Sequence, residues 1–290
     1  MAEDKKPLVS LCSLALSTID YDAYGSHLAF AYSCGRYLPD YDFLLATPGR
    51  MAIDQARNAA IQYSKDRGAK WIFFWDDDTI LDPKTLVKLI EKAEEQDIDI
   101  IQPLYFIRGD QFPVMAFVKD KETGKLRGIK DEEWDNADGG LVDLDATGNG
   151  CTLYRMELFD IVDHPWFLTI PGQYTEDIHF FSKMSLTEYT PSIKLDTSFS
   201  CGHMTENIAI NADNYRVVRS MHFLDKMKEG EKKEQTLSGL EKVTKSVAKA
   251  LEEKGKRDFE SAGKFYRRRV DADTEGDSVG SEAGSSASEC

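Results

Sequence analysis

The stretch "WIFFWDDDTILDP" (Trp71 to Pro83) joins five consecutive apolar residues to three consecutive aspartates. An apolar run of this kind is typical of a strand that is buried on both faces of a sheet. Adjacent carboxylates repel one another, and the helix that follows needs only Asp82 as its N-cap, with Pro83 at its first position. Folding alone gives no reason for Asp76 to Asp78, so we predict a functional site at the end of this strand.

The segments around this strand alternate between strand and helix patterns. Strand patterns occupy 7–16, 41–49, 70–75 and 97–106. One helix is predicted between the second and third strands, ending at Gly68, with a face formed by Ala52, Ala56, Ala59, Ala60 and Tyr63. A second helix begins at Pro83, with a buried stripe formed by Leu86, Leu89, Ile90 and Ala93. This alternation predicts a doubly wound α/β fold, in which ligands bind beyond the carboxyl ends of the strands.

Changes in composition divide the 290 residues into three predicted parts. Residues 1–224 form the main α/β domain. Residues 225–270 form a helical extension, whose apolar stripe packs on the body or on another chain, so that a homo-oligomer through this helix is one interpretation. Its basic "KFYRRR" cluster, which includes Arg267 to Arg269, is either a solvated helix end or a docking site for an anionic partner. Residues 271–290 form an acidic tail of small polar residues, for which we predict disorder.

The charge of the chain restricts the partners that it can bind. The net charge is −15, and residues 1–224 hold 22 basic and 36 acidic side chains, a net of −14. A body this acidic repels bulk nucleic acid and anionic membranes, but it can bind a phosphate compound through an intervening cation.

Membrane and secretion signals are not apparent in the sequence. No apolar run approaches the roughly 18 residues that span a bilayer. The N-terminal segment contains acids and no cleavage-site pattern, which predicts no signal peptide. The five cysteines are widely spaced and contain no C-x-x-C pair, which favours buried free thiols over a disulfide framework or a zinc site. We therefore expect a cytoplasmic protein without membrane insertion.

The aspartates fit one of several acidic motifs. A calcium-binding EF-hand loop and a phosphatase of the haloacid dehalogenase type both fail at Ile80, where each needs an oxygen-bearing side chain. What remains is an Asp-x-Asp pair, because Asp76 and Asp78 point to the same side of an extended segment. Such a pair suits Mg²⁺ or Mn²⁺, which bind one or two carboxylates and complete their shell with water and substrate phosphates.

Together with "QARNAA" upstream, this stretch resembles the nucleotide-diphosphosugar glycosyltransferases of the GT-A fold, especially small bacterial and phage-borne members related to family two. The resemblance covers about residues 7–205 and continues in order through "TGNGCTLYR", "TEDIHFF" and "CGHMT". It implies a GT-A (Rossmann-like) mixed sheet flanked by helices. It also implies metal-dependent transfer of a sugar from a nucleotide-diphosphosugar to an acceptor hydroxyl.

The resemblance further implies roles for individual residues. Asp78, with Asp76 directly or through water, and His203 would hold Mn²⁺ or Mg²⁺ against the diphosphate of the donor. Asp177 would be the general base that takes the proton of the acceptor hydroxyl, with Glu176 as the less favoured candidate. The donor-binding residues would be Arg57, Asp76, Asp77, Gly148 and Gly150.

The substrates are less well defined by the sequence. The loop "ATPGR" lacks the aspartate with which relatives often read the base, so a UDP-sugar is only the default donor. The acceptor is a glycan, a protein side chain or a modified base of viral DNA. Inversion at the anomeric carbon is expected, since a base at Asp177 suits a single in-line displacement. Two rival interpretations are a sugar-phosphate nucleotidyltransferase and a non-catalytic module that binds a nucleotide-sugar.

Overall fold

The structure, a computed structural model, describes residues 5–15, 18–109, 111–135, 137, 140–205, 208–221 and 249. Contacts within the chain separate two units, Met1–Phe223 and Leu224–Cys290. Apart from Lys249, which is helical and exposed, the predicted helical extension, its basic cluster and the acidic tail lie outside the described residues. The predictions made for them stay predictions, and the first unit is described below.

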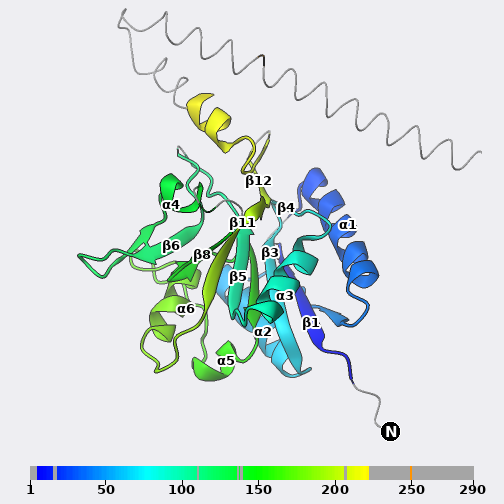
Figure 1. Cartoon of the computed structure of the whole chain (residues 1–290). Coiled ribbons are helices and arrows are strands. Elements are labelled where there is room, and N and C mark those ends of the chain that lie inside the picture. Colours follow the sequence, from blue (N-terminus) through cyan, green and yellow to red (C-terminus); the bar gives the residue numbers. More distant parts are fainter. Residues whose placement is uncertain are drawn as a thin grey trace, which may run out of the picture. The chain divides into compact units, whose positions relative to one another are not determined.

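A mixed sheet of seven strands forms the centre of the described part of the chain (Figure 1). Its strands are β1 (Leu8–Leu14), β2 (Asp42–Leu45), β3 (Ala69–Asp76), β5 (Ile100–Leu104), β8 (Leu141–Asp143), β10 (Cys151–Arg155) and β11 (Ile193–Ser200). They follow the order β2-β1-β3-β10-β5-β11-β8. β1 is parallel to β2 and β3, whereas β10 is antiparallel to both β3 and β5. The carboxyl ends of β1, β2, β3 and β5 therefore share one edge of the sheet.

The described residues also form two three-stranded sheets, one in the order β13-β12-β4 and one in the order β7-β6-β9. Their strands are β4 (Thr79–Ile80), β6 (Ala116–Lys119), β7 (Leu126–Gly128), β9 (Ala146–Thr147), β12 (Gly202–Met204) and β13 (Ala209–Ile210). In the first, β12 pairs with β4 in antiparallel register, so that His203 lies opposite Thr79. This pairing brings the end of the described fold back to the aspartates.

Helices cover both faces of the central sheet. They are α1 (Tyr21–Tyr37), α2 (Ile53–Lys65), α3 (Thr85–Glu95), α4 (Asp131–Asp135), α5 (Leu158–Ile161) and α6 (Glu176–Met184). Because side chains alternate along a strand, β3 contributes to two buried clusters. Trp71, Phe73 and Trp75 pack with α1 and α3, whereas Ile72 and Phe74 pack with α2 and α6. The predicted α/β fold with a mixed sheet flanked by helices is confirmed.

Two helices differ from the sequence-based expectation: α1 was not predicted, and α3 begins later than predicted. Helix α1 was not predicted, because large apolar residues such as Tyr21 and Tyr32 lie on its exposed face. Helix α3 begins at Thr85 rather than Pro83, since Asp82 caps a preceding turn by accepting a hydrogen bond from the backbone N–H of Lys84 at 2.8 Å.

The face predicted for α2 is buried only in part. Ala56 and Ala60 are buried, but Ala59 and Tyr63 are exposed. The buried face also includes Arg57, whose guanidinium pairs with Asp76 and Glu176.

The described cysteines are buried free thiols, as predicted. Cys151 and Cys201 are in contact, with a Sγ–Sγ distance of 2.7 Å. Burial raises the pKa of the Cys34 thiol to about 12, which suits an inert core residue. Among the residues that the structure describes, no helix combines the length and apolar character needed to cross a bilayer.

Candidate active site

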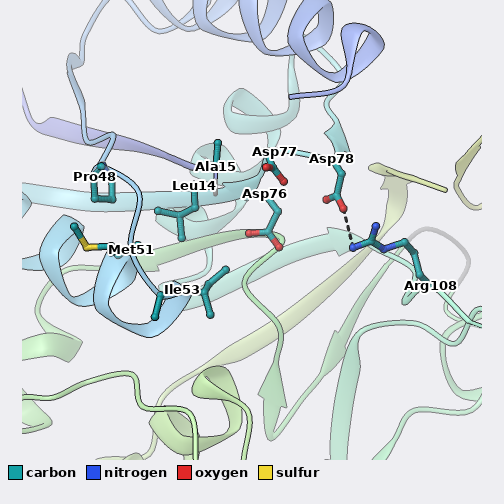
Figure 2. Close-up of a pocket in the computed structure, with 12 residues that line it drawn as sticks. Leu14, Ala15, Pro48, Met51, Ile53, Asp76, Asp77, Asp78 and Arg108 are labelled. Atoms are coloured by element: carbon teal, nitrogen blue, oxygen red, sulfur yellow. Dashed lines mark ion pairs between the residues drawn. The ribbon is translucent and has the colours of Figure 1, made fainter. Parts of the chain in front are cut away.

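A pocket of about 330 Å³ opens at the edge where β1, β2 and β3 end. One wall is apolar and includes Leu14, Ala15, Pro48, Met51 and Ile53, from the ends of β1 and β2 and the start of α2. Asp76 to Asp78 and Arg108 form the polar side, and Figure 2 shows the aspartates between the apolar wall and Arg108. A pocket of this size with one apolar and one charged side suits a ligand that has an apolar ring and a charged group.

Asp78, on the polar side of this pocket, lies next to His203. The pairing of β4 with β12 places His203 Nε2 3.4 Å from Asp78 Oδ2. The same carboxylate oxygen forms an ion pair with Arg108, whose Nη2 lies 2.9 Å away. The other oxygen, Oδ1, is buried and has no hydrogen-bond partner among the described residues. A buried carboxylate oxygen without a partner is costly, so this atom is suited to a cation or another ligand.

The imidazole of His203 has a defined orientation. Its Nδ1 lies 2.6 Å from the backbone carbonyl of Phe106. Because a carbonyl oxygen only accepts, Nδ1 must carry the proton that is donated, and Nε2 faces Asp78. The ring also stacks on Tyr105, with ring centroids 4.7 Å apart. A backbone carbonyl that accepts from one ring nitrogen, and so leaves the other available as a ligand, is common for metal-ligating histidines.

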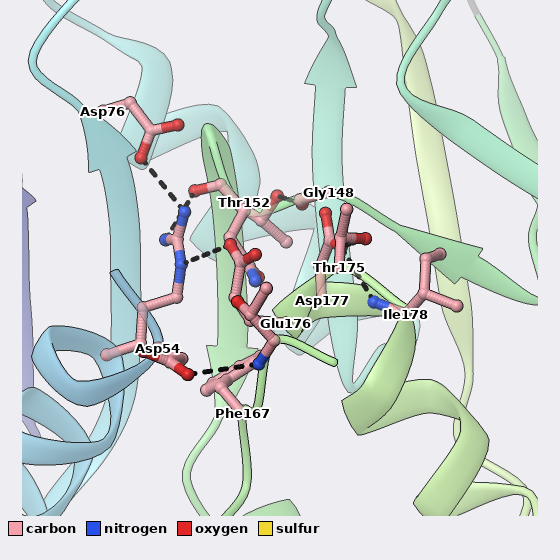
Figure 3. Close-up of polar contacts among 12 residues, drawn as sticks. Asp54, Asp76, Gly148, Thr152, Phe167, Thr175, Glu176, Asp177 and Ile178 are labelled. Carbon is pink, nitrogen blue, oxygen red and sulfur yellow. Dashed lines mark hydrogen bonds and ion pairs between the residues drawn. The ribbon is translucent and has the colours of Figure 1, made fainter. Parts of the chain in front are cut away.

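Asp76 is held by a buried guanidinium. Arg57, whose side chain is 2% exposed, contacts Asp76 Oδ1 through Nη2 at 3.1 Å and Glu176 Oε1 through Nε at 3.2 Å. Its Nη1 donates to the backbone carbonyl of Asn149 at 3.4 Å. Figure 3 shows the two acids that Arg57 joins, Asp76 and Glu176, on separate elements. Arg57 therefore connects the aspartate motif to the first turn of α6 from beneath the pocket, and its predicted contact with the donor stays a prediction.

The ionisation of the acids follows from these contacts. Burial, followed by the charges of Asp78 and Asp76, raises the pKa of Asp77 above its usual range. Burial also opposes ionisation of Asp78, but His203 and Arg108 together outweigh it and lower its pKa. For Glu176, burial raises the pKa, the charge of Arg57 opposes this shift, and the net direction is upward.

Asp177 occupies the first turn of α6 and is buried. In the described structure, the hydrogen bonds to its carboxylate fall on Oδ1, which accepts from the Thr175 hydroxyl and from the backbone N–H of Ile178 at 2.8 Å. Figure 3 shows Asp177 beside Thr175 and Ile178. One oxygen is thus fixed, which orients the other, Oδ2. This geometry is compatible with the predicted role of general base and does not test it.

Gly148 and Gly150 have a packing reason to be glycine. A Cβ on Gly148 would lie 2.3 Å from Met115 Cγ, and one on Gly150 would lie 2.4 Å from the ring of Tyr105. The Met115 side chain is flexible, whereas Tyr105 is buried and stacks on His203. Gly150 therefore maintains the position of His203 through Tyr105. Contact of either glycine with a sugar stays a prediction.

Gly150→Ala is expected to destabilise the protein by about 1–3 kcal/mol, because the added methyl group overpacks a buried aromatic ring. Gly35→Ala is the matched control, since nothing lies within 4 Å of a Cβ at that position of α1. In a helix interior this change is expected to be neutral or stabilising by about 0.5–1 kcal/mol. Denaturant unfolding measures both, and a Gly150→Ala variant as stable as the wild type would show that Tyr105 can move freely.

Sequence reasoning missed Arg108 and Tyr105. Arg108 comes four residues after the end of β5, so its signal was a basic residue beyond the carboxyl end of a predicted strand. Tyr105 had no signal, because its role depends on Gly150 and His203. Trp134 and Trp166, whose rings are of a kind that can stack on a sugar, are buried in the core.

The protein ligands available to a cation are few. Within the described ranges, no group of three or more His, Cys, Asp or Glu side chains is arranged to hold a metal ion. Asp78 and His203 converge, whereas Asp76 has one oxygen on Arg57. Two or three protein ligands of oxygen and nitrogen type fit Mg²⁺ or Mn²⁺, which keep several waters and bind substrate phosphates.

In an open α/β sheet, the edge where the strands have their carboxyl ends is the usual place for a ligand, and the acidic pocket lies there. Residues 44–160 match the family model described as "Glycosyl transferase family 2". The chain carries a glycosyltransferase family 2 domain, and the protein is an enzyme of the glycosyltransferase class. The matched range contains Arg57, the three aspartates and both glycines; Asp177 and His203 lie beyond it. The predicted resemblance and the GT-A-like fold class are confirmed.

Two solved structures are similar to this chain. A197 from STIV has a TM-score of 0.47 and 18% identity, covering 71% of this chain and 90% of that chain. GalNAc-T7 with UDP, GalNAc and Mn²⁺ has a TM-score of 0.47 and 11% identity, covering 85% of this chain and 55% of that chain. Neither likeness bears on the function proposed below. No match was found among curated protein sequences.

Proposed function

We propose that this glycosyltransferase transfers a sugar from a nucleotide-diphosphosugar to an acceptor hydroxyl with the help of a divalent cation. The observation that carries the proposal is the convergence of Asp78 and His203 beside a pocket with an apolar wall. The apolar wall at the ends of β1 and β2 suits the nucleoside. The diphosphate then lies against the aspartates, which requires positive charge between them.

Asp78 and His203 are the proposed ligands of the cation, with Asp76 contributing its oxygen that is free of Arg57. The buried and unpartnered Oδ1 of Asp78 supports this assignment, as does the hydrogen bond that orients His203. Mn²⁺ or Mg²⁺ bound here would supply Lewis-acid stabilisation of the departing nucleoside diphosphate. Arg57 keeps Asp76 in place from below, and Tyr105 keeps the imidazole in place from the side.

Asp177 is the proposed general base. Its fixed Oδ1 leaves Oδ2 to accept the proton of the attacking hydroxyl, which suits a single displacement with inversion. Glu176 is the less favoured candidate, because its carboxylate is already engaged by Arg57. The donor sugar, with UDP as the default nucleotide, and the acceptor, whether glycan, protein or modified DNA base, are open parts of the proposal. The family match favours sugar transfer over nucleotidyl transfer or simple binding.

Thermal unfolding with UDP, GDP, ADP, CDP and dTDP, each with and without Mn²⁺, tests the donor site. One nucleotide is expected to raise the Tm by roughly 5–10 °C at a hundredfold excess over its Kd, only when Mn²⁺ is present. Asp78→Asn is expected to abolish this shift, measured against its own baseline, because it removes the charge that holds the cation.

Asp97→Asn is the matched control for this experiment. It also removes one acid, at a side chain that is 92% exposed and precedes β5, at the other edge of the sheet. The backbone φ of 51° at this position is one that asparagine tolerates. The control should keep the full shift. If no nucleotide stabilises the wild type, the proposed donor site is refuted.

A further inference from the structure

Arg108 is the one basic side chain among the described residues that line the pocket. Arg57, the nearest other guanidinium along the aspartate motif, is buried between Asp76 and Glu176 and is already engaged. Arg108 differs in exposure, since 58% of its side chain is accessible. Its charge can therefore move within the pocket without being taken out of water.

Arg108 contacts the carboxylate that is proposed to bind the cation. Its Nη2 lies 2.9 Å from Asp78 Oδ2, the same oxygen that faces His203 Nε2 at 3.4 Å. An arginine side chain does not lose its proton in proteins, so it cannot yield this place by deprotonation. A divalent cation on Asp78 thus competes with the guanidinium for one carboxylate, and binding of the cation favours release of the arginine.

The backbone at Arg108 is anchored close to the side chain. The backbone N–H of Ile107 donates to the carbonyl of Pro113 at 2.8 Å, and Phe106 forms a bridge with Val114. The start of the loop after β5 is therefore tied to the strand-like segment that follows it. Reorientation of Arg108 requires rotation about its side-chain bonds and no movement of the sheet.

We propose that Arg108 is a diphosphate-binding residue that neutralises Asp78 until the donor and its cation arrive, and then turns to the diphosphate. This inference rests on the proposed donor site. The guanidinium presents paired N–H donors that match phosphate oxygens. A cation on Asp78 offers no such donors and so does not replace this contact. Arg108 thereby links two events, since the cation releases the arginine and the released arginine binds the anionic group that the cation also attracts.

Two binding measurements on the whole protein test this inference. Titration with Mn²⁺ alone measures the competition, and titration with UDP at saturating Mn²⁺ measures the contact with the diphosphate; if another nucleoside diphosphate gives the larger stabilisation, it replaces UDP. Arg108→Gln is expected to bind Mn²⁺ about 3- to 10-fold more tightly, because the competing charge is gone. The same variant is expected to bind the nucleotide about tenfold more weakly, because a charge-assisted hydrogen bond is lost.

Arg108→Lys and Arg67→Gln are the companion variants. The lysine keeps the charge without the paired donors, so its Mn²⁺ affinity should stay near that of the wild type while its nucleotide affinity falls. Arg67 follows α2 and precedes β3, at the edge of the sheet opposite the pocket, and its removal should change neither affinity. Opposite changes in the two affinities of Arg108→Gln would support the proposal.

Three outcomes would overturn it, and they can be told apart. An unchanged nucleotide affinity in Arg108→Gln would show that Arg108 does not touch the diphosphate. A parallel loss of both affinities would show that Arg108 merely holds Asp78 in place. Failure of the wild type to bind any nucleoside diphosphate would refute the donor site itself, and this inference with it.

Discussion

Replacement of Asp177 by asparagine is expected to lower kcat by about 10²–10⁴-fold, the contribution typical of a general base. Asparagine keeps an oxygen that can accept from Thr175 and from the backbone N–H of Ile178, so the first turn of α6 should be preserved. The amide replaces only the oxygen that would take the proton. Binding of the nucleoside diphosphate with Mn²⁺ should therefore stay near the wild-type value.

Steady-state release of nucleoside diphosphate, with the donor identified by thermal stabilisation, measures this effect. Glu176→Gln is the comparison variant, because it removes the neighbouring carboxylate and keeps its shape. Its main consequence should be a loss of stability through Arg57, with a smaller decrease in kcat. Unchanged turnover in Asp177→Asn would eliminate Asp177 as the base. A loss in Glu176→Gln that exceeds the loss in Asp177→Asn would assign the role to Glu176.

Arg57→Met is expected to destabilise the folded protein by about 3 kcal/mol, near the lower limit for breaking a buried ion pair. Methionine fills much of the same volume, so the effect reports the charge rather than a cavity. Removing the guanidinium leaves Asp76 and Glu176 without their partner, and Asp76 is only 27% exposed. The free energy of unfolding from urea denaturation, with the slope unchanged, is the measurement.

Two further variants make this result specific. Arg127→Met removes a guanidinium that pairs with Glu133 near the surface, and it should cost much less stability than Arg57→Met. The double variant Arg57→Met/Glu176→Gln should recover part of the loss, because one of the stranded charges is removed as well. If Arg57→Met and Arg127→Met lose the same stability, the buried network does not have the importance inferred from its geometry.

The predictions for Asp177→Asn and Arg57→Met concern neighbouring parts of the site that Arg57 connects. Arg57 joins Asp76, in the proposed donor site, to Glu176, which is 119 residues from Arg57 in sequence and adjacent to the proposed base. A variant that weakens this connection affects the whole site through stability, whereas Asp177→Asn affects one chemical step. Measuring both therefore separates maintenance of the site from catalysis within it.

Much of the architecture could be predicted from local pattern. The apolar run before Asp76, the stripe of Leu86, Leu89 and Ile90, and the strand–helix alternation all depend on residues close in sequence. These patterns reflect which side chains can be buried on a strand or a helix, and the burial of apolar surface is the main driving force of folding. Helix α1 escaped prediction because several of its large apolar side chains face solvent.

The arrangement of the site was decided by tertiary structure. The sequence by itself determined that an acidic motif follows a buried strand, because the two segments are consecutive in the chain. The pairing of β4 with β12 brought His203 to Asp78, the packing of α2 under β3 buried Arg57 against two acids, and the loop after β5 carried Arg108 to the pocket. Each of these contacts joins segments distant in the chain, and their proximity depends on strand order and helix rotation, which arise from packing of the whole domain.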